Sequence, residues 1–114
     1  MAIEEERAVI DTGILRVHVQ PRGDEVVVGL VGELDLASSG ELSTTLAELA
    51  ASGRDVVVDL ADLRFIDSTG MAALLRARGT AEANGCMLVL RKPHANVART
   101  LALAALDTVF QLQD

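Results

Sequence analysis

The sequence has no tryptophan, no tyrosine and only two phenylalanines, Phe65 and Phe110. Its core must therefore consist of aliphatic side chains, and the aromatic platforms on which single-stranded nucleic acids stack are missing. Basic residues are also scarce, since 10 lysines and arginines stand against 17 aspartates and glutamates, which gives a formal net charge of −7. Such a chain lacks the positive surface that attracts a nucleic-acid backbone. Direct binding of DNA or RNA is therefore not expected.

Cysteines and long apolar runs are scarce as well. Cys86 is the only cysteine, so an internal disulfide is excluded, and its place in the apolar run 86–90 indicates a buried structural thiol. No apolar run approaches the roughly 20 residues that span a bilayer. The first residues, 1–6, are acidic at their end where a signal peptide would be basic. We expect a cytoplasmic protein without membrane insertion.

The motifs of common catalytic and cofactor sites are also missing. His18 and His94 are the only histidines, and neither stands at ligand spacing from the other or from Cys86, so no metal site is predicted. No glycine-rich phosphate-binding motif occurs. Ser68 is not in a nucleophile elbow, because Ile66 stands where that turn requires glycine. A hydrolase or transferase using Ser68 would also lack a base and an oxyanion loop, so we expect no enzyme and no cofactor.

What the sequence does contain is the pattern of one packed α/β domain. The chain has 114 residues, half of them hydrophobic, which suits a single globule. We expect an N-terminal leader over residues 1–13, which could be mobile, and a domain over residues 14–114. The apolar periodicities predict a mixed sheet of about five strands with helices packed on it, in the order ββαβαβαβ. The expected strands lie at 14–20, 25–31, from 56 onward, 86–91 and 109–112.

Capping residues predict where the first helix begins and ends. Ser38 is followed three residues later by Glu41, which is the spacing of a capping box. The first helix should therefore begin at Ser38. Gly53 is a suitable C-terminal stop.

The stretch 56–75 is the centre of the predicted fold. It begins with an apolar run rich in β-branched residues, which indicates a buried parallel strand. It ends with Met71, Leu74 and Leu75, whose (i, i+3, i+4) spacing predicts a helix lying on that strand. The residues expected in the core are Val57, Leu60 and Leu75.

The turn Asp67-Ser68-Thr69-Gly70 separates this strand from this helix. The Ser68 hydroxyl has two interpretations there. It could cap the helix, or it could accept a phosphate, because free backbone N–H groups and the helix dipole favour an anion. Asp35 and Asp67 both follow apolar strands and should emerge at the same edge of the sheet near Ser68. Paired carboxylates can act as acid and base or bind Mg²⁺, but without a third carboxylate or a neighbouring histidine we favour turn and cap roles.

Two segments carry the most specific pattern of the chain: Gly32-Glu33-Leu34-Asp35 and Phe65-Ile66-Asp67-Ser68-Thr69-Gly70-Met71. Together they resemble the bacterial anti-sigma-factor antagonists, whose domain is called STAS, and the resemblance extends from about Leu15 to Phe110. It implies that Ser68 is the phosphorylation site. It also implies a partner-binding surface near that site, which would include Asp35, Asp67, Thr69, Gly70 and Met71. Family members commonly carry one more helix after the last strand, where only Gln113 and Asp114 follow here.

The resemblance implies a phosphorylation-controlled protein-binding module. The unphosphorylated form would bind an anti-sigma-factor serine kinase and release the sigma factor for transcription, as in a stress response. Phosphorylation of Ser68 by that kinase would switch binding off, and a serine phosphatase would restore it. ATP would belong to the kinase. The alternative is a STAS subunit or scaffold of a transporter or sensory complex, which acts by protein docking and is never phosphorylated.

The neighbours of Ser68 carry further expectations. The Asp67 carboxylate should shape the turn and orient the Ser68 hydroxyl. Thr69 should offer the less available hydroxyl, because the χ1 angle of its β-branched side chain is restricted. Arg64, Arg76 and Arg78 either contact an acidic partner surface or solvate exposed faces, and the sequence favours neither.

Overall fold

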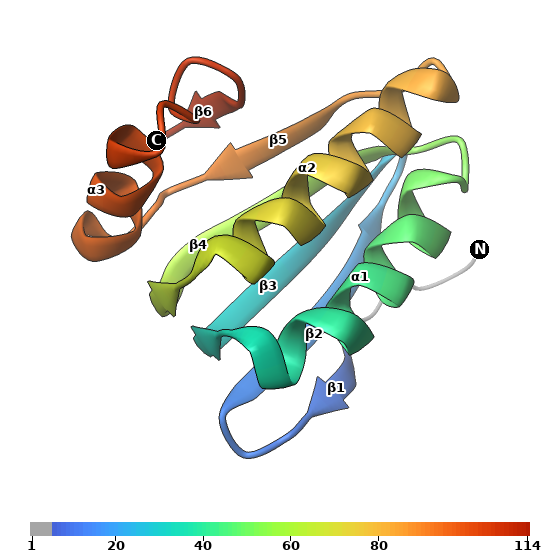
Figure 1. The fold of residues 1–114 in the computed structure, drawn as a ribbon. Coiled ribbons are helices and arrows are strands. Elements are labelled where there is room, and N and C mark those ends of the chain that lie inside the picture. Colours follow the sequence, from blue (N-terminus) through green and yellow to red (C-terminus); the bar gives the residue numbers. More distant parts are fainter. Residues whose placement is uncertain (1–5) are drawn as a thin grey trace.

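The fold is a six-stranded sheet with three helices, and the computed structural model describes it over residues 6–114. Figure 1 shows α1 and α2 side by side on one face of the sheet, with α3 next to β6. The elements in chain order are β1 (Arg7–Asp11), β2 (Leu15–Arg22), β3 (Glu25–Leu34), α1 (Leu36–Ala50), β4 (Asp55–Ile66), α2 (Ser68–Ala83), β5 (Leu88–Arg91), α3 (Ala95–Leu103) and β6 (Gln111–Gln113).

The sheet is mixed, as the sequence predicted. Its spatial order is β1-β2-β3-β4-β5-β6. The pairs β1–β2 and β2–β3 are antiparallel, whereas β3, β4, β5 and β6 run parallel to one another. Each parallel connection passes through a helix, because two parallel neighbours need a long crossover between them.

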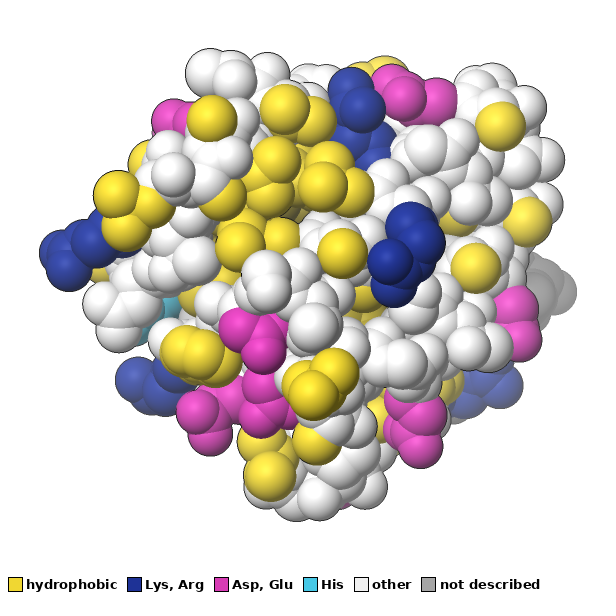
Figure 2. Space-filling view, viewed as in Figure 1, with side chains coloured by type: hydrophobic (Ala, Val, Ile, Leu, Met, Phe, Trp, Pro, Cys, Tyr) yellow, Lys and Arg dark blue, Asp and Glu magenta, His cyan; other side chains and the backbone are white. Residues whose placement is uncertain are grey.

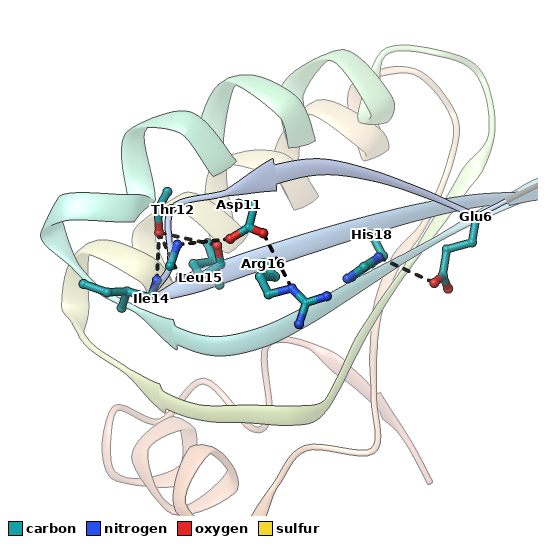
Figure 3. Close-up of polar contacts among 8 residues, drawn as sticks. Glu6, Asp11, Thr12, Ile14, Leu15, Arg16 and His18 are labelled. Carbon is teal, nitrogen blue, oxygen red and sulfur yellow. Dashed lines mark hydrogen bonds and ion pairs between the residues drawn. The ribbon is translucent and has the colours of Figure 1, made fainter.

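The expectation of about five strands was wrong by one strand. The additional strand is β1, which lies in the segment expected to be a leader, and residues 1–5 of that segment lie outside the described residues. A bulge between Ala8 and Ile10 interrupts the alternation of β1, and Ile10 is its only buried side chain. Figure 3 shows the turn that follows, in which the backbone N–H groups of Ile14 and Leu15 donate to the Thr12 hydroxyl oxygen at 3.2 and 3.0 Å.

β3 is longer than predicted, and the lengths of β3 and β4 position the site. β3 continues to Leu34 and β4 continues to Ile66, and these two residues are paired across the parallel ladder. Two register shifts along the ladder interrupt the apolar alternation that marks a strand in the sequence. The backbone of β3 near its end requires glycine at position 32. Gly32 has a φ of +108°, which other residues rarely adopt, and a Cβ there would stand 2.1 Å from the Ile14 carbonyl oxygen.

The core is aliphatic apart from Phe110, which is buried, and one of its three predicted members was misplaced. Val57 and Leu60 are buried, at 5% and 0% exposure. Leu75 is only half-buried at the edge of the core, whereas Leu74 beside it is completely buried. The buried face of α2 is formed by Gly70, Ala73, Leu74, Ala77 and Ala81. The prediction relied on the large apolar side chains of this helix. Its buried face consists mainly of small residues, which allow the helix to approach the sheet closely.

The starts of α1 and β5 also differ from the prediction. α1 begins at Leu36 with Asp35 as its N-cap, so the box that the sequence placed at Ser38 and Glu41 is wrong. Ser38 belongs instead to a box with Asp35, whose backbone N–H donates to the Ser38 hydroxyl oxygen at 3.1 Å. β5 begins at Leu88, so Cys86 precedes the strand and is half-buried.

Candidate functional site

The candidate site is built where β3 and β4 end side by side. Asp35 directly follows β3 and caps α1, and Asp67 directly follows β4 and caps α2. The backbone N–H of Asp67 donates to the carbonyl oxygen of Leu34 at 3.2 Å, which joins the two strand ends. The carboxyl ends of adjacent parallel strands thus bring two helix N-termini to one edge of the sheet, as the sequence predicted for the two aspartates.

Both aspartates have the cap role that the sequence favoured. Asp35 accepts a hydrogen bond from the backbone N–H of Ala37 at 3.1 Å, and the Ser38 hydroxyl donates to the same carboxylate at 3.2 Å. Asp67 accepts from the backbone N–H groups of Thr69 and Gly70 at 3.0 and 3.1 Å. Such caps satisfy N–H groups that have no partner within the helix.

Asp67 has an additional partner in the Thr69 hydroxyl, which donates to Oδ1 at 2.6 Å. This hydrogen bond is the largest cause that lowers the pKa of Asp67 from its ordinary value of 3.8. Partial burial opposes the shift, and the backbone N–H groups of Gly70, Thr69 and Leu36 reinforce it. The expectation that Asp67 orients the Ser68 hydroxyl was wrong, because its carboxylate is directed to Thr69 and to the helix N–H groups.

Ser68 is the first residue of α2, and its side chain is exposed. Within residues 6–114 its hydroxyl has no hydrogen-bond partner. Because Asp67 is the N-cap, the capping interpretation of Ser68 was wrong. The site therefore presents one free hydroxyl at a helix N-terminus, beside the carboxylate of Asp67.

Gly70 and Met71 pack this turn against the strand ends and the core. Gly70 is buried, and a Cβ at this position would stand 2.7 Å from Leu34 Cγ and 2.9 Å from Ile66 Cγ1. Met71 is half-buried against the core, and its backbone N–H donates to the carbonyl oxygen of Asp67 at 3.0 Å. Glycine is thus what allows the first turn of α2 to contact the ends of both strands.

The family follows from comparison of the whole chain with known proteins. The family model described as the Mlab STAS domain matches residues 17–113. The chain belongs to the STAS domain family. A curated relative, the anti-sigma-B factor antagonist of Bacillus subtilis strain 168, is 24% identical over 98 residues, which is 86% of this chain and 90% of that protein.

Solved structures have the same fold. An anti-sigma factor antagonist from Mycobacterium paratuberculosis superposes with a TM-score of 0.76 at 23% identity and covers 90% of this chain and 88% of its own. The anti-sigma factor antagonist SpoIIAA in its unphosphorylated form gives a TM-score of 0.73 at 20% identity, over 84% of this chain and 86% of its own. The phosphorylated form of the Bacillus protein SpoIIAA gives 0.68 at 19% identity, over 86% and 90%.

The STAS domain also exposes two large apolar side chains that are close to the site in the sequence, and the sequence pattern predicted neither exposure. Leu36, the first residue of α1, is 76% exposed, and Phe65, near the end of β4, is 46% exposed. Figure 2 shows hydrophobic and acidic side chains intermixed in this region, where α1 and α2 begin. The exposure of Leu36 could have been predicted by placing the N-cap at Asp35. The residue after an N-cap is the first residue of the helix and lies at its N-terminal end.

The three arginines around the turn in sequence have different surroundings in the STAS domain. Arg76 donates to the Ser43 hydroxyl of α1 at 3.2 Å, and Arg78 forms an ion pair with Glu82 at 3.3 Å. Arg64 is exposed on β4 and has no side-chain partner among the described residues. Of the three, Arg64 is therefore the one that is free to contact a partner.

Neither histidine takes part in the site. His18 pairs with Glu6 at 3.5 Å on β2, as Figure 3 shows, and His94 caps α3 by accepting from the backbone N–H of Asn96 at 3.3 Å. Within residues 6–114, no group of three or more histidine, cysteine, aspartate or glutamate side chains could hold a metal ion. In the same part of the chain, no helix is long and apolar enough to cross a membrane.

Proposed function

We propose that this STAS domain is an anti-sigma factor antagonist that is switched off by phosphorylation of Ser68. In its unphosphorylated form it binds an anti-sigma serine kinase, and this binding releases the sigma factor. The relatives that share its fold include anti-sigma factor antagonists, one of them solved in phosphorylated and unphosphorylated forms. The observation that carries the proposal is the exposed Ser68 hydroxyl, which is free of hydrogen bonds within residues 6–114 and stands at the N-terminus of α2.

The partner binds a surface that combines this hydroxyl with apolar contacts. We use the name docking surface for Leu36 and Ser68, which lie at the starts of α1 and α2. Exposed side chains of this size contribute binding energy when a partner removes them from water. Asp35, Asp67, Thr69, Gly70 and Met71 form the scaffold beneath the docking surface and hold it in place through the capping bonds and close packing described above.

Phosphorylation acts on the docking surface through charge. A phosphate on Ser68 adds about −1.5 to −2 charges at neutral pH. The N-terminus of α2 accommodates this charge, so the fold persists. An apolar interface does not, because the phosphate would be desolvated beside the ionised Asp67. A loss of about 3–4 kcal/mol follows from this desolvation and repulsion, and it would weaken binding by roughly two to three orders of magnitude.

The reaction itself belongs to the partner enzymes. The kinase supplies ATP and transfers its terminal phosphoryl group to Ser68, and a serine phosphatase removes the group again. The STAS domain contributes only the acceptor hydroxyl and the docking surface. It therefore needs no cofactor of its own for this function.

A pull-down from the native cytoplasm tests the proposal. Immobilised wild-type protein is expected to capture a serine kinase, identified by mass spectrometry, and to release it when MgATP is added. Ser68→Ala should capture the same kinase and retain it in MgATP, because it cannot be phosphorylated. Ser52→Ala, which changes an exposed serine in the turn after α1, is the matched control and should behave as wild type. Release of the kinase from Ser68→Ala by MgATP would show that the proposed switch is wrong.

A second candidate function is that of a STAS subunit or scaffold of a transporter or sensory complex. The murine anion transporter Slc26a9 superposes on 70% of this chain with a TM-score of 0.61 at 23% identity, over 14% of its own chain. The docking surface would then hold a permanent partner, and Ser68 would stay unmodified. Capture of a partner that is not a kinase, and that MgATP does not release, would favour this function.

A further inference from the structure

A single oxygen atom of Asp67 holds together the first turn of α2. Oδ1 accepts the backbone N–H groups of Thr69 and Gly70 and also the Thr69 hydroxyl. The hydroxyl contact, at 2.6 Å, is the shortest of the three. Thr69 and Ser68 therefore differ although they are neighbours: one hydroxyl is engaged with a carboxylate, and the other has no partner within residues 6–114.

We propose that the hydrogen bond between Asp67 and Thr69 selects the phosphoacceptor by withholding the Thr69 hydroxyl from phosphoryl transfer. This inference rests on the proposed function, because it explains why the kinase modifies Ser68 alone. Asp67 and Thr69 are then positioning residues of the switch. The sequence offered only the restricted χ1 of threonine as a reason for its lower availability, whereas the structure supplies a specific bond.

The chemistry of the transfer explains how such a bond withholds a hydroxyl. The acceptor oxygen forms a new bond to the terminal phosphorus of ATP, the bond between that phosphorus and the leaving ADP oxygen breaks, and the hydroxyl proton passes to a base of the kinase. The Thr69 hydroxyl donates its proton to Asp67 Oδ1 and therefore does not offer it to that base. The side chain would have to break a hydrogen bond to a charged group before it could react, which lowers its reactive population roughly ten- to a hundredfold.

The opposite role for Asp67 has to be considered, since a carboxylate bound to a hydroxyl can also activate it as a base. The surroundings of Asp67 oppose this role. The same hydrogen bonds that fix its carboxylate hold its pKa below the ordinary value, so it is a weak acceptor of a full proton at neutral pH. Thr69 is also half-buried, whereas Ser68 is exposed. The hydrogen bonds of Asp67 and the partial burial of Thr69 therefore both indicate that Asp67 withholds the Thr69 hydroxyl and does not activate it.

The first test measures phosphate on Thr69 directly, in a protein that lacks the competing serine. With MgATP and the kinase captured by wild-type protein, Ser68→Ala should take up no phosphate. Asp67→Ala in that background removes the acceptor of the Thr69 hydroxyl, and mass spectrometry should then find phosphothreonine at position 69. Asp67→Asn in the same background is the matched control, because its amide oxygen can still accept from Thr69, and it should remain unmodified.

The outcomes of this test separate the inference from the proposed function. Phosphate on Thr69 in the single mutant Ser68→Ala would overturn the selection by Asp67. Equal amounts of phosphothreonine in the two double mutants, which add Asp67→Ala or Asp67→Asn, would overturn it too. An unmodified Thr69 in the folded Asp67→Ala background would overturn it as well, with folding checked by circular dichroism. Absence of phosphate on Ser68 in wild-type protein would instead overturn the proposed function, and the selection would fall with it.

The second test needs no kinase. Carboxyl NMR titration should show the pKa of Asp67 rising toward its ordinary value in Thr69→Val, which keeps the shape of threonine but lacks the hydroxyl. Thr69→Ser retains a donor and should titrate as wild type does. An Asp67 titration that is unchanged in Thr69→Val would show that the hydrogen bond does not hold the carboxylate.

Discussion

Asp35 and Asp67 occupy equivalent places, each after a strand and before a helix, but their hydrogen-bond partners differ. Asp35 shares its carboxylate with a serine in the third position of α1, and this serine is buried. Asp67 shares its carboxylate with a threonine in the second position of α2, beside the exposed Ser68. Both helices are therefore capped by an aspartate. At α1 the neighbouring serine hydroxyl is buried, whereas at α2 the hydroxyl of Ser68 is accessible.

The titration of Asp67 predicts a pH-dependent stability. The pKa of Asp67 in the folded state is lowered below 3.8, so its ionised form stabilises the fold. This stabilisation is fully present at pH values above the pKa of the unfolded state. This contribution is lost as the pH falls through the folded pKa. Asp67→Asn keeps the cap but removes the titration, so the mutant should lose less stability than wild type between about pH 5 and pH 2. Urea unfolding across this range measures the difference, and Asp107→Asn, at an exposed turn, is the control. Parallel curves for wild type and Asp67→Asn would contradict the prediction.

Ser68→Asp separates binding from folding at a single residue. The hydroxyl has no partner to lose within the described residues, and a carboxylate in the first turn of a helix stabilises by about 0.3–1 kcal/mol. The melting temperature should therefore stay at or slightly above that of wild type, while capture of the kinase weakens. A mutant that melts much earlier, or that binds as tightly as wild type, would contradict the role assigned to Ser68.

At the scale of the element, α2 approaches the sheet closely because its buried face is made of small residues. Gly70 contacts the ends of β3 and β4, and Ala73 and Ala77 continue the same face. Leu74 is the only large side chain on this face. The position of the Ser68 turn therefore depends on how closely the helix packs as well as on its cap.

Gly70→Ala tests this packing, with a matched control in the same helix. The added methyl would stand 2.7 Å from Leu34 Cγ, an atom of a completely buried side chain. Overpacking of this kind destabilises by about 1–3 kcal/mol. Gly79→Ala meets no described atom within 4 Å and should instead stabilise by up to about 1 kcal/mol, because alanine is the better helix former. Chemical denaturation of both mutants measures the two effects, and changes of the same sign would contradict the packing described here.

Much of each element could be predicted from the sequence, and the errors have physical causes. The apolar runs gave the helices and the parallel strands correctly, because burial on a sheet leaves a strong periodic signal. The stripe of α2 was displaced by one position, since Met71 and Leu75 outweigh Gly70 and Ala73 in any pattern based on size. The start of α1 was displaced because Asp35 and Ser38 are both good caps, and only the length of β3 decides between them.

At the scale of the whole molecule, β1 was missed and β3 was predicted too short, for a common reason. β1 contains a bulge, and the ladder of β3 and β4 contains two register shifts, so the two-residue alternation is broken in each case. The sequence could place Asp35 and Asp67 at one edge of the sheet, because parallel strands end together. It could not show that the carboxylate contacts Thr69, which depends on side-chain rotamers within one helical turn.

The molecule exposes several large apolar side chains, and the proposed function requires that they are not equivalent. Leu36 belongs to the docking surface, whereas Leu103 lies on α3. Both are strongly exposed, at 76% and 83%. Neither side chain contributes much to the stability of the fold, because substitutions of exposed side chains outside the core usually change the free energy of unfolding by less than about 0.5 kcal/mol.

Leu36→Ser and Leu103→Ser therefore form a matched pair that tests where the partner binds. The first should weaken kinase capture by roughly tenfold or more, the effect of losing a side chain that contributes about 1.4 kcal/mol or more to an interface. The second should leave capture unchanged, and both mutants should melt close to wild type. Binding isotherms with the captured kinase measure the difference. Equal weakening by the two substitutions would mean that the interface extends over α3, and an effect of Leu103→Ser alone would move the docking surface away from Ser68.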